Sequence, residues 1–290
     1  MKLVTQTEVL SDRFGDEKAV RIICESGFDG IDFSMFDLDE EPCILNKSGY
    51  KNHLKNLINI ADSYGVTFEQ AHAPFPSAKE DNKEYNDFMF EKLKKAIEVA
   101  GILDTKIIVV HPVQFSTDQK ERNLELYRSL EPFAEEYGVK IALENMWGVK
   151  MIDGNRKIVP NVCSVAAEFN DYFDSLNSSN FTTCLDLGHC GLVGDDAASM
   201  IKDMNSRLGC LHIHDNDFIH DSHTLPYTRD MDWDSILKAL AEVDYKGNFT
   251  YEADYFMKKF PDDLLPSCEK FMHDVGRSMM AKIESYRAAK

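Results

Sequence analysis

The sequence lacks a long hydrophobic run, a paired cysteine motif and an excess of cations. Its longest aliphatic run, Ile107–Val110, is far too short to cross a bilayer, and the first residues turn polar before a signal-peptide core can form. We therefore expect a cytoplasmic protein without a membrane partner. Seven cysteines with no Cys-x-x-Cys spacing argue against a disulfide framework and a thiolate zinc site, so the thiols should be reduced and mostly buried.

The charge balance is strongly acidic. Lys and Arg number 32 against 50 Asp and Glu, which gives a formal charge of -18. Because nucleic-acid backbones are bound through Lys and Arg, this balance disfavours a nucleic-acid partner, although it leaves room for a locally basic groove. Residues 36–42 add four acidic side chains after a predicted strand, where a duplex-binding enzyme would be expected to offer cations or a wedge.

Short β-rich segments alternate with helical stretches along the whole chain, as in a parallel sheet built from strand-helix units. Each predicted strand is followed by a helical candidate, and no linker, low-complexity tract, internal sequence repeat or Pro-rich hinge interrupts the alternation. Eight such units in 290 residues predict a single-domain α/β protein over residues 1–290, a (β/α)8 TIM barrel, with an open doubly wound sheet as the alternative. The predicted strands are 2–7, 30–35, 66–75, 105–113, 140–146, 181–189, 208–216 and 248–255.

Several helix ends have recognisable caps. Asn82, Thr117 and Asp232 precede predicted helices at 85–100, 118–137 and 233–243, and each can accept a hydrogen bond from a first-turn N–H group. Gly65 and Gly138 follow helical stretches and can adopt the left-handed conformation that ends a helix.

Ionisable residues stand near the ends of six predicted strands, although strands buried on both faces should be almost entirely apolar. In a barrel the carboxyl ends of all strands meet at one mouth, so these side chains should converge there. Buried charges are costly unless they are paired or bind a metal, and the joint pattern predicts a metal site. The residues are His72, His111, Glu144, Asp186 with His189, His212 with His214, and Glu252.

Carboxylates combined with imidazoles suit Mn²⁺, Zn²⁺, Co²⁺ or Mg²⁺. His212 and His214 are two residues apart on a strand and should face the same side. We expect His212 to lie deeper and to be the ligand, and His214 to lie nearer the rim.

From residues 27–32 (Gly-Phe-Asp-Gly-Ile-Asp) to residues 251–254 (Tyr-Glu-Ala-Asp), the chain resembles the xylose isomerase-like barrel superfamily. That group contains sugar isomerases and epimerases, inosose dehydratases and apurinic endonucleases. The resemblance to its ketose epimerases implies one metal held by Glu144, Asp186, His212 and Glu252. It also implies that His189 contacts the substrate.

Three further segments resemble the endonuclease branch. They are His-Ala-Pro at 72–74, His-Pro at 111–112 and Asp-x-His at 221–223. By that resemblance His72, His111, His189, Asp221 and His223 would join the other four residues in a three-zinc site. Sugar-active members also carry such segments, so these residues would either bind additional metal or surround a substrate.

We therefore expect a divalent-metal-dependent isomerase or epimerase acting on a sugar or sugar phosphate by proton transfer through a metal-stabilised enediolate. By resemblance, Glu144 and Glu252 would be the catalytic acid/base pair while also touching the metal. The alternatives are a zinc-dependent phosphodiesterase acting on abasic DNA, an inosose dehydratase-like lyase and a non-catalytic sugar-binding barrel. The sequence is silent on the substrate's identity and on whether the chain forms a homo-oligomer.

Overall fold

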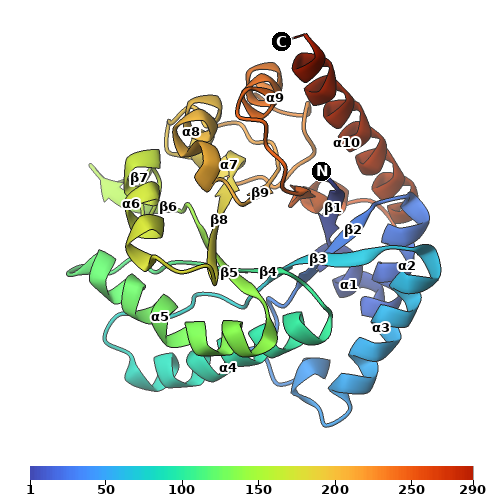
Figure 1. Ribbon diagram of the computed structural model, residues 1–290, viewed down its shortest axis with the longest axis horizontal. Helices are drawn as coiled ribbons and strands as arrows, with labels where there is room; N and C mark the ends of the chain where they lie inside the picture. The colour runs from blue at the N-terminus through green and yellow to red at the C-terminus, as the bar shows by residue number, and fades with distance from the viewer. Residues whose placement is uncertain (290) are drawn as a thin grey trace.

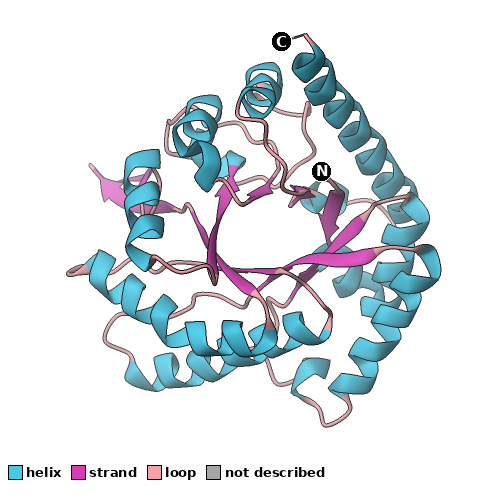
Figure 2. Ribbon diagram, in the orientation of Figure 1, coloured by secondary structure: helices cyan, strands magenta, loops and turns pink. Residues whose placement is uncertain are grey.

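Parallel strands follow one another around a ring in the computed structural model, which describes residues 1–289 (Figures 1 and 2). Within those residues the ring has eight strands, in the order β10-β1-β2-β3-β4-β5-β8-β9. Their bounds are β1 (Leu3–Gln6), β2 (Gly30–Ser34), β3 (Thr67–His72), β4 (Ile107–Val110), β5 (Lys140–Glu144), β8 (Phe181–Asp186), β9 (Cys210–His212) and β10 (Phe249–Tyr251).

The ring closes between β9 and β10 through a short seam. Ile213 and Tyr251 form a single parallel bridge, in which the Ile213 N–H donates to the Thr250 carbonyl at 2.9 Å and the Glu252 N–H donates to the Ile213 carbonyl at 3.2 Å. On its other side β10 pairs with β1 in parallel. The closed α/β barrel is therefore confirmed over the open sheet.

Helices surround the strands on the outside of the ring (Figure 2). The outward faces of the strands pack against them to form the main hydrophobic core. In the described residues no helix is both long and apolar enough to cross a membrane. The helices are α1 (Glu8–Phe14), α2 (Asp16–Ser26), α3 (Tyr50–Tyr64), α4 (Lys83–Ile102), α5 (Gln119–Tyr137), α6 (Ala166–Leu176), α7 (Leu187–Leu192), α8 (Ala197–Met204), α9 (Trp233–Glu242) and α10 (Leu265–Ala288), with 3-10 turns η1 (Ile44–Asn46), η2 (Asn205–Arg207) and η3 (Asp254–Met257).

Most of the predicted helix ends are confirmed. The side chains of Asn82 and Asp232 accept hydrogen bonds from the first turns of α4 and α9, and Gly65 and Gly138 end α3 and α5 in the left-handed conformation. The prediction for Thr117 is wrong. Helix α5 begins at Gln119, and the residue before it is Asp118, whose backbone is in the left-handed conformation. No side chain caps the first turn, so the hydroxyl of Thr117 does not serve as a cap.

Two predictions about the strand-helix alternation are wrong. An antiparallel hairpin, β6 (Trp147–Ile152) and β7 (Asn155–Pro160), stands between β5 and α6. Strand β8 ends at Asp186, because that carboxylate accepts the N–H of His189 and starts helix α7. His189 therefore lies on a helix. The other strands are also mostly shorter than predicted, since they stop where the barrel mouth opens into loops.

Small apolar side chains lie inside the barrel directly below the mouth. Val109, Ala142, Cys184 and Cys210 form an apolar cluster from four neighbouring strands. All seven cysteines are free and six of them are buried, as predicted from their scattered positions. This apolar layer supports the polar layer above it.

Candidate metal and substrate site

Strand periodicity builds the polar layer directly on the apolar one. Successive side chains alternate between the two faces of a strand, so residues two apart point the same way. Two positions beyond the apolar cluster, the strands therefore present His111, Glu144, Asp186 and His212 toward the barrel axis. The nine predicted metal or substrate ligands, together with His214, lie at this mouth in groups whose potential ligand atoms are within 4.8 Å of one another.

The central group consists of Glu144, Asp186, His212 and Glu252, all buried. Nδ1 of His212 lies 3.0 Å from Oε1 of Glu144 and 3.3 Å from Oε2 of Glu252. Three carboxylates and one imidazole from β5, β8 and the two strands at the seam thus converge on one point. This donor set suits a hard or borderline divalent cation.

Glu144 also belongs to a second group. His111 Nε2 lies 2.9 Å and His72 Nε2 lies 3.7 Å from Oε2 of Glu144. That oxygen has no hydrogen-bond partner among the described residues, although both ring nitrogens lie near it. A buried carboxylate oxygen facing two imidazoles in this way is fitted to a shared cation.

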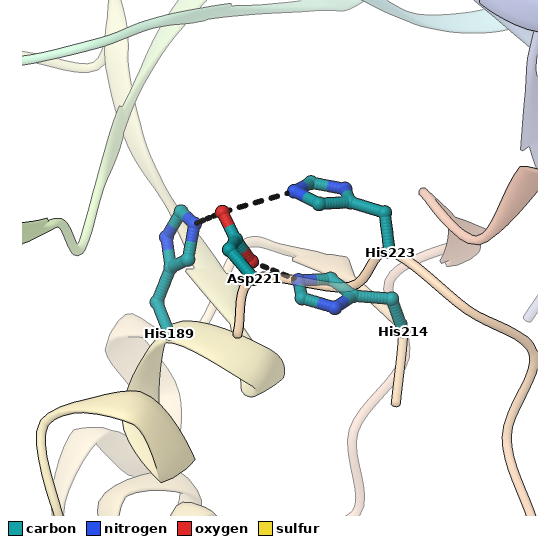
Figure 3. A group of neighbouring side chains, drawn as sticks. All are labelled: His189, His214, Asp221 and His223. Atoms are coloured by element: carbon teal, nitrogen blue, oxygen red, sulfur yellow. Dashed lines mark ion pairs between the residues drawn. The ribbon is translucent and has the colours of Figure 1, made fainter. Parts of the chain in front are cut away.

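The third group is formed around Asp221, which lies between the imidazoles of His189, His214 and His223 (Figure 3). Its Oδ2 is 3.2 Å from His223 Nε2 and 3.5 Å from His189 Nε2, and its Oδ1 is 3.8 Å from His214 Nε2. Oδ1 has no hydrogen-bond partner among the described residues although it is buried. The group combines residues from α7 and from the loop between β9 and α9.

His214 lies two residues beyond His212, beneath the loop at the barrel mouth. It is fully buried, because the loop that carries Asp221 and His223 folds over it, and its ring stacks on that of His223 at 4.2 Å. His214 Nε2 also lies 3.1 Å from Asp186 Oδ1, so this residue joins the central group to the third one. The two-residue spacing from His212 was the sequence feature that could have placed His214 in the site.

Backbone carbonyls orient three of the imidazoles. Nδ1 of His72, His189 and His223 pairs with the carbonyls of Ala73, Asn145 and Glu252 at 2.9, 2.8 and 3.1 Å. Each Nδ1 therefore carries the proton that is donated, which leaves Nε2 free to face the carboxylates. Metal-ligating histidines are held in this manner.

Burial and neighbouring imidazoles push the carboxyl pKa values apart. Burial raises the pKa of Glu252 to about 8, and His212 only partly offsets it. For Glu144 burial also opposes ionisation, but His212 and His111 outweigh it and hold the pKa well below its ordinary value. Burial lowers the pKa of His111 to about 4. Without a cation the site would therefore keep Glu252 protonated and Glu144 ionised near neutral pH.

A cavity of about 970 Å³ opens from the third group toward solvent. Asp221 and His223 form part of its wall, together with the aromatic rings of Phe75, Trp147 and Tyr255. Trp147 begins the β6–β7 hairpin and its Nε1–H donates to Asp221 Oδ2 at 3.0 Å, which ties the hairpin to the site. This volume accommodates a small molecule above the ligand groups.

A model of the family described as the xylose isomerase-like TIM barrel matches residues 20–264. The uncharacterized protein MJ1311 of Methanocaldococcus jannaschii is 27% identical over 211 residues, which are 69% of this chain and 69% of that protein.

Two solved structures share the fold across nearly the whole chain. A D-tagatose 3-epimerase-like protein superposes with a TM-score of 0.75 at 20% identity, covering 98% of this chain and 99% of that one. The IOLI protein, solved with a zinc atom, superposes with a TM-score of 0.72 at 18% identity, covering 98% of each chain. With most of its length matched by the family model, the chain belongs to the xylose isomerase-like TIM barrel family.

Proposed function

We propose that this protein is a divalent-metal-dependent isomerase or epimerase that moves a proton on a carbon next to the carbonyl of a sugar or sugar phosphate. The observation that carries the proposal is the convergence of Glu144 and Glu252 on one imidazole nitrogen, His212 Nδ1, inside a buried four-ligand group. Two carboxylates at one point can take and return a carbon-bound proton.

The residues present fit a cation. Glu144, Asp186, His212 and Glu252 would hold it, and Glu144 Oε2 is a buried oxygen without a hydrogen-bond partner in residues 1–289. When bound, the cation supplies Lewis-acid stabilisation of the negative charge that develops on the substrate's oxygens. Elemental analysis of the purified protein would identify it among Mn²⁺, Zn²⁺, Co²⁺ and Mg²⁺.

The protein residues have separate tasks in this scheme. One of Glu144 and Glu252 would accept the proton from carbon while the other, protonated, would return a proton, and Asp186 and His212 would hold the cation. His189, held by the Asn145 carbonyl at Nδ1, would present Nε2 to a substrate oxygen. The buried setting excludes bulk water, which protects the intermediate charge.

The solved relatives give independent support. The D-tagatose 3-epimerase-like protein is named after a sugar epimerase, and the IOLI protein was solved with zinc. The experiment is incubation of the purified protein in D₂O with a panel of ketoses, their phosphates and inososes, followed by mass spectrometry and product analysis. Deuterium appearing on the carbon beside the carbonyl supports the proposal, and loss of water from an inosose would reassign the chain as a lyase.

A zinc phosphodiesterase is the second candidate, because the structure brings two further ligand groups next to the central one. Glu144 is shared with His72 and His111, and His214 connects Asp186 to the Asp221 group. Elemental analysis separates the two functions: one ion per chain favours the isomerase and three favour the hydrolase. An acidic hollow beside the mouth, lined by Asp12, Asp16, Asp37 and Glu40, opposes the approach of a duplex.

A further inference from the structure

The β6–β7 hairpin is basic, although the chain as a whole is acidic. Residues 147–160 contain Lys150, Arg156 and Lys157 against a single acid, Asp153, whereas the whole chain has a formal charge of -18. The hairpin projects from the barrel beside α6 (Figure 1). We therefore ask which negatively charged group the cations of this basic segment contact.

The three cations of the hairpin have no counter-ion in the part of the chain that the structure describes. Within residues 1–289 none of them forms an ion pair or a side-chain hydrogen bond, although acidic side chains are plentiful. Lys150 is also the direct cross-strand partner of Lys157 in the hairpin register. Like charges directly opposite each other destabilise a strand pair. The arrangement is therefore one that an external anion would stabilise.

Two of these cations, adjacent on β7, border the cavity above the ligand groups. Arg156 and Lys157 line the cavity of about 970 Å³ whose wall also includes Asp221 and His223 of the third ligand group. Among the described residues that line this cavity, no other Lys or Arg is present. The hydrogen bond from Trp147 to Asp221 fixes the base of the hairpin against that group. The same cavity is thus lined by two cations that form no ion pair within residues 1–289 and by two potential metal ligands.

We propose that Arg156 and Lys157 bind the phosphate ester of a small phosphorylated sugar whose carbonyl end reaches the metal-ligand groups. This inference rests on the proposed function and narrows its substrate to the anionic class. The guanidinium offers a planar fork that matches phosphate oxygens, and the ammonium adds a point charge. Two cations suit one phosphate, whereas a duplex is commonly held through about 6 to 10 phosphate contacts.

The test compares each phosphorylated ketose with its neutral parent by calorimetry on the metal-loaded protein, using D-fructose 6-phosphate against D-fructose and D-ribulose 5-phosphate against D-ribulose. At least one phosphorylated sugar should bind tenfold or more tightly than its parent, since hydrogen bonds to charged groups are the stronger ones. In the Arg156→Gln/Lys157→Gln double variant that preference should disappear, with the neutral sugar's affinity unchanged.

The matched control is Arg21→Gln/Lys55→Gln, which removes the same charge from two exposed cations of α2 and α3 that form no ion pair within residues 1–289. It should leave the preference within about twofold of the parent protein, because exposed charges that lie far from the ligand are largely screened by salt. Equal affinity for phosphorylated and neutral sugars, or an equal loss in both double variants, would overturn the inference. Tighter binding of an abasic duplex than of any sugar phosphate would also overturn it.

The inference and the proposed function can fail separately. Preferential binding of a sugar phosphate through Arg156 and Lys157, without deuterium exchange in any sugar, would keep the anion site and refute the isomerase. Exchange in neutral sugars alone, unaffected by the double variant, would keep the isomerase and refute the anion site.

Discussion

Asp32 Oδ2 lies 3.7 Å from Nε2 of His212, the ring nitrogen that does not face the carboxylates of the central group. Gln70 Nε2 donates to the same oxygen at 2.9 Å, and Asp32, Gln70 and His212 are all buried. A carboxylate behind a metal-ligating histidine fixes the ring's orientation and raises its basicity. Neither Asp32 nor Gln70 was singled out from the sequence, because β2 and β3 only become neighbours of β9 across the closed barrel.

Replacing Asp32 should weaken metal binding without unfolding the chain. Asp32→Asn keeps the shape of the side chain but removes its charge, and we expect affinity for Mn²⁺ or Zn²⁺ to fall roughly 10- to 100-fold. Titration calorimetry with circular dichroism measures both effects. The exposed Asp62→Asn on α3 is the control and should bind metal normally. Unchanged metal affinity in Asp32→Asn would contradict a positioning role.

Glu144→Gln and Glu252→Gln should each retain the fold and lose turnover by orders of magnitude, roughly 10²-fold or more, since general acid/base groups contribute on that scale. Steady-state kinetics on the substrate found by the deuterium experiment would measure the loss. Metal content must be determined for each variant, because both residues belong to the four-ligand group. Near-normal turnover in either variant would refute its catalytic role.

Metal affinity should rise with pH up to about 8. Burial raises the pKa of Glu252 to about 8, so at neutral pH the metal-free site holds a proton there that a cation must displace. Burial disfavours a charged His212, but Glu252 and Glu144 outweigh it and raise its pKa, so its proton is displaced in the same direction. Calorimetry from pH 6 to 9 should show a shallower dependence in Glu252→Gln. A pH-independent affinity in the parent protein would rule the linkage out.

Gly188 is packed against the imidazole of His214. A Cβ at this position would lie 2.0 Å from Cε1 of His214, so Gly188→Ala must displace the ring or the turn of α7. We expect weaker metal binding by the central group, which His214 contacts through Asp186, or destabilisation of about 1 to 3 kcal/mol from overpacking. Thermal unfolding and metal counting measure these outcomes. Gly49→Ala at the start of α3, where a Cβ meets nothing within 4 Å, is the control.

Glu269 on α10 is fully buried and neither carboxylate oxygen has a hydrogen-bond partner among the described residues. Burial, with a contribution from Asp254, raises its pKa well above the ordinary value. The folded chain therefore holds a proton that the unfolded chain releases above about pH 4.3, and stability is lost as pH rises from there. Glu269→Gln should raise stability at pH 8 by on the order of 1 kcal/mol or more.

The same substitution should have little effect near pH 4, where both states keep the Glu269 proton. Chemical denaturation of Glu269→Gln and the parent at the two pH values provides the comparison. A stability difference that is equal at pH 4 and pH 8 would show that Glu269 does not titrate on unfolding.

The polar layer was predictable because it follows from two local rules. Side chains two apart share a strand face, and parallel strands of a barrel end at one mouth, so His111, Glu144, Asp186 and His212 were placed together without any knowledge of contacts. The start of α7 was also signalled, since Asp186 can cap a helix beginning at Leu187. Its apolar neighbours instead favoured a longer strand.

Other features depend on long-range packing that the local pattern does not contain. The β6–β7 hairpin has an exposed, two-sided sequence whose alternation is weak, so nothing distinguishes it from a loop before the chain folds. The burial of His214 requires the loop that carries Asp221 and His223 to fold back across it. Tertiary structure determined both outcomes, and both bear on how a substrate would be bound.

The short seam between β9 and β10 lies between two candidate ligands. His212 immediately precedes Ile213, and Glu252 immediately follows Tyr251, while only two backbone hydrogen bonds connect these segments among the described residues. A cation bound by both side chains would link the two strands across the seam. Uptake of the ion would then strengthen the closed barrel at its seam, and an ion-free chain would loosen first at the place where its substrate would be held.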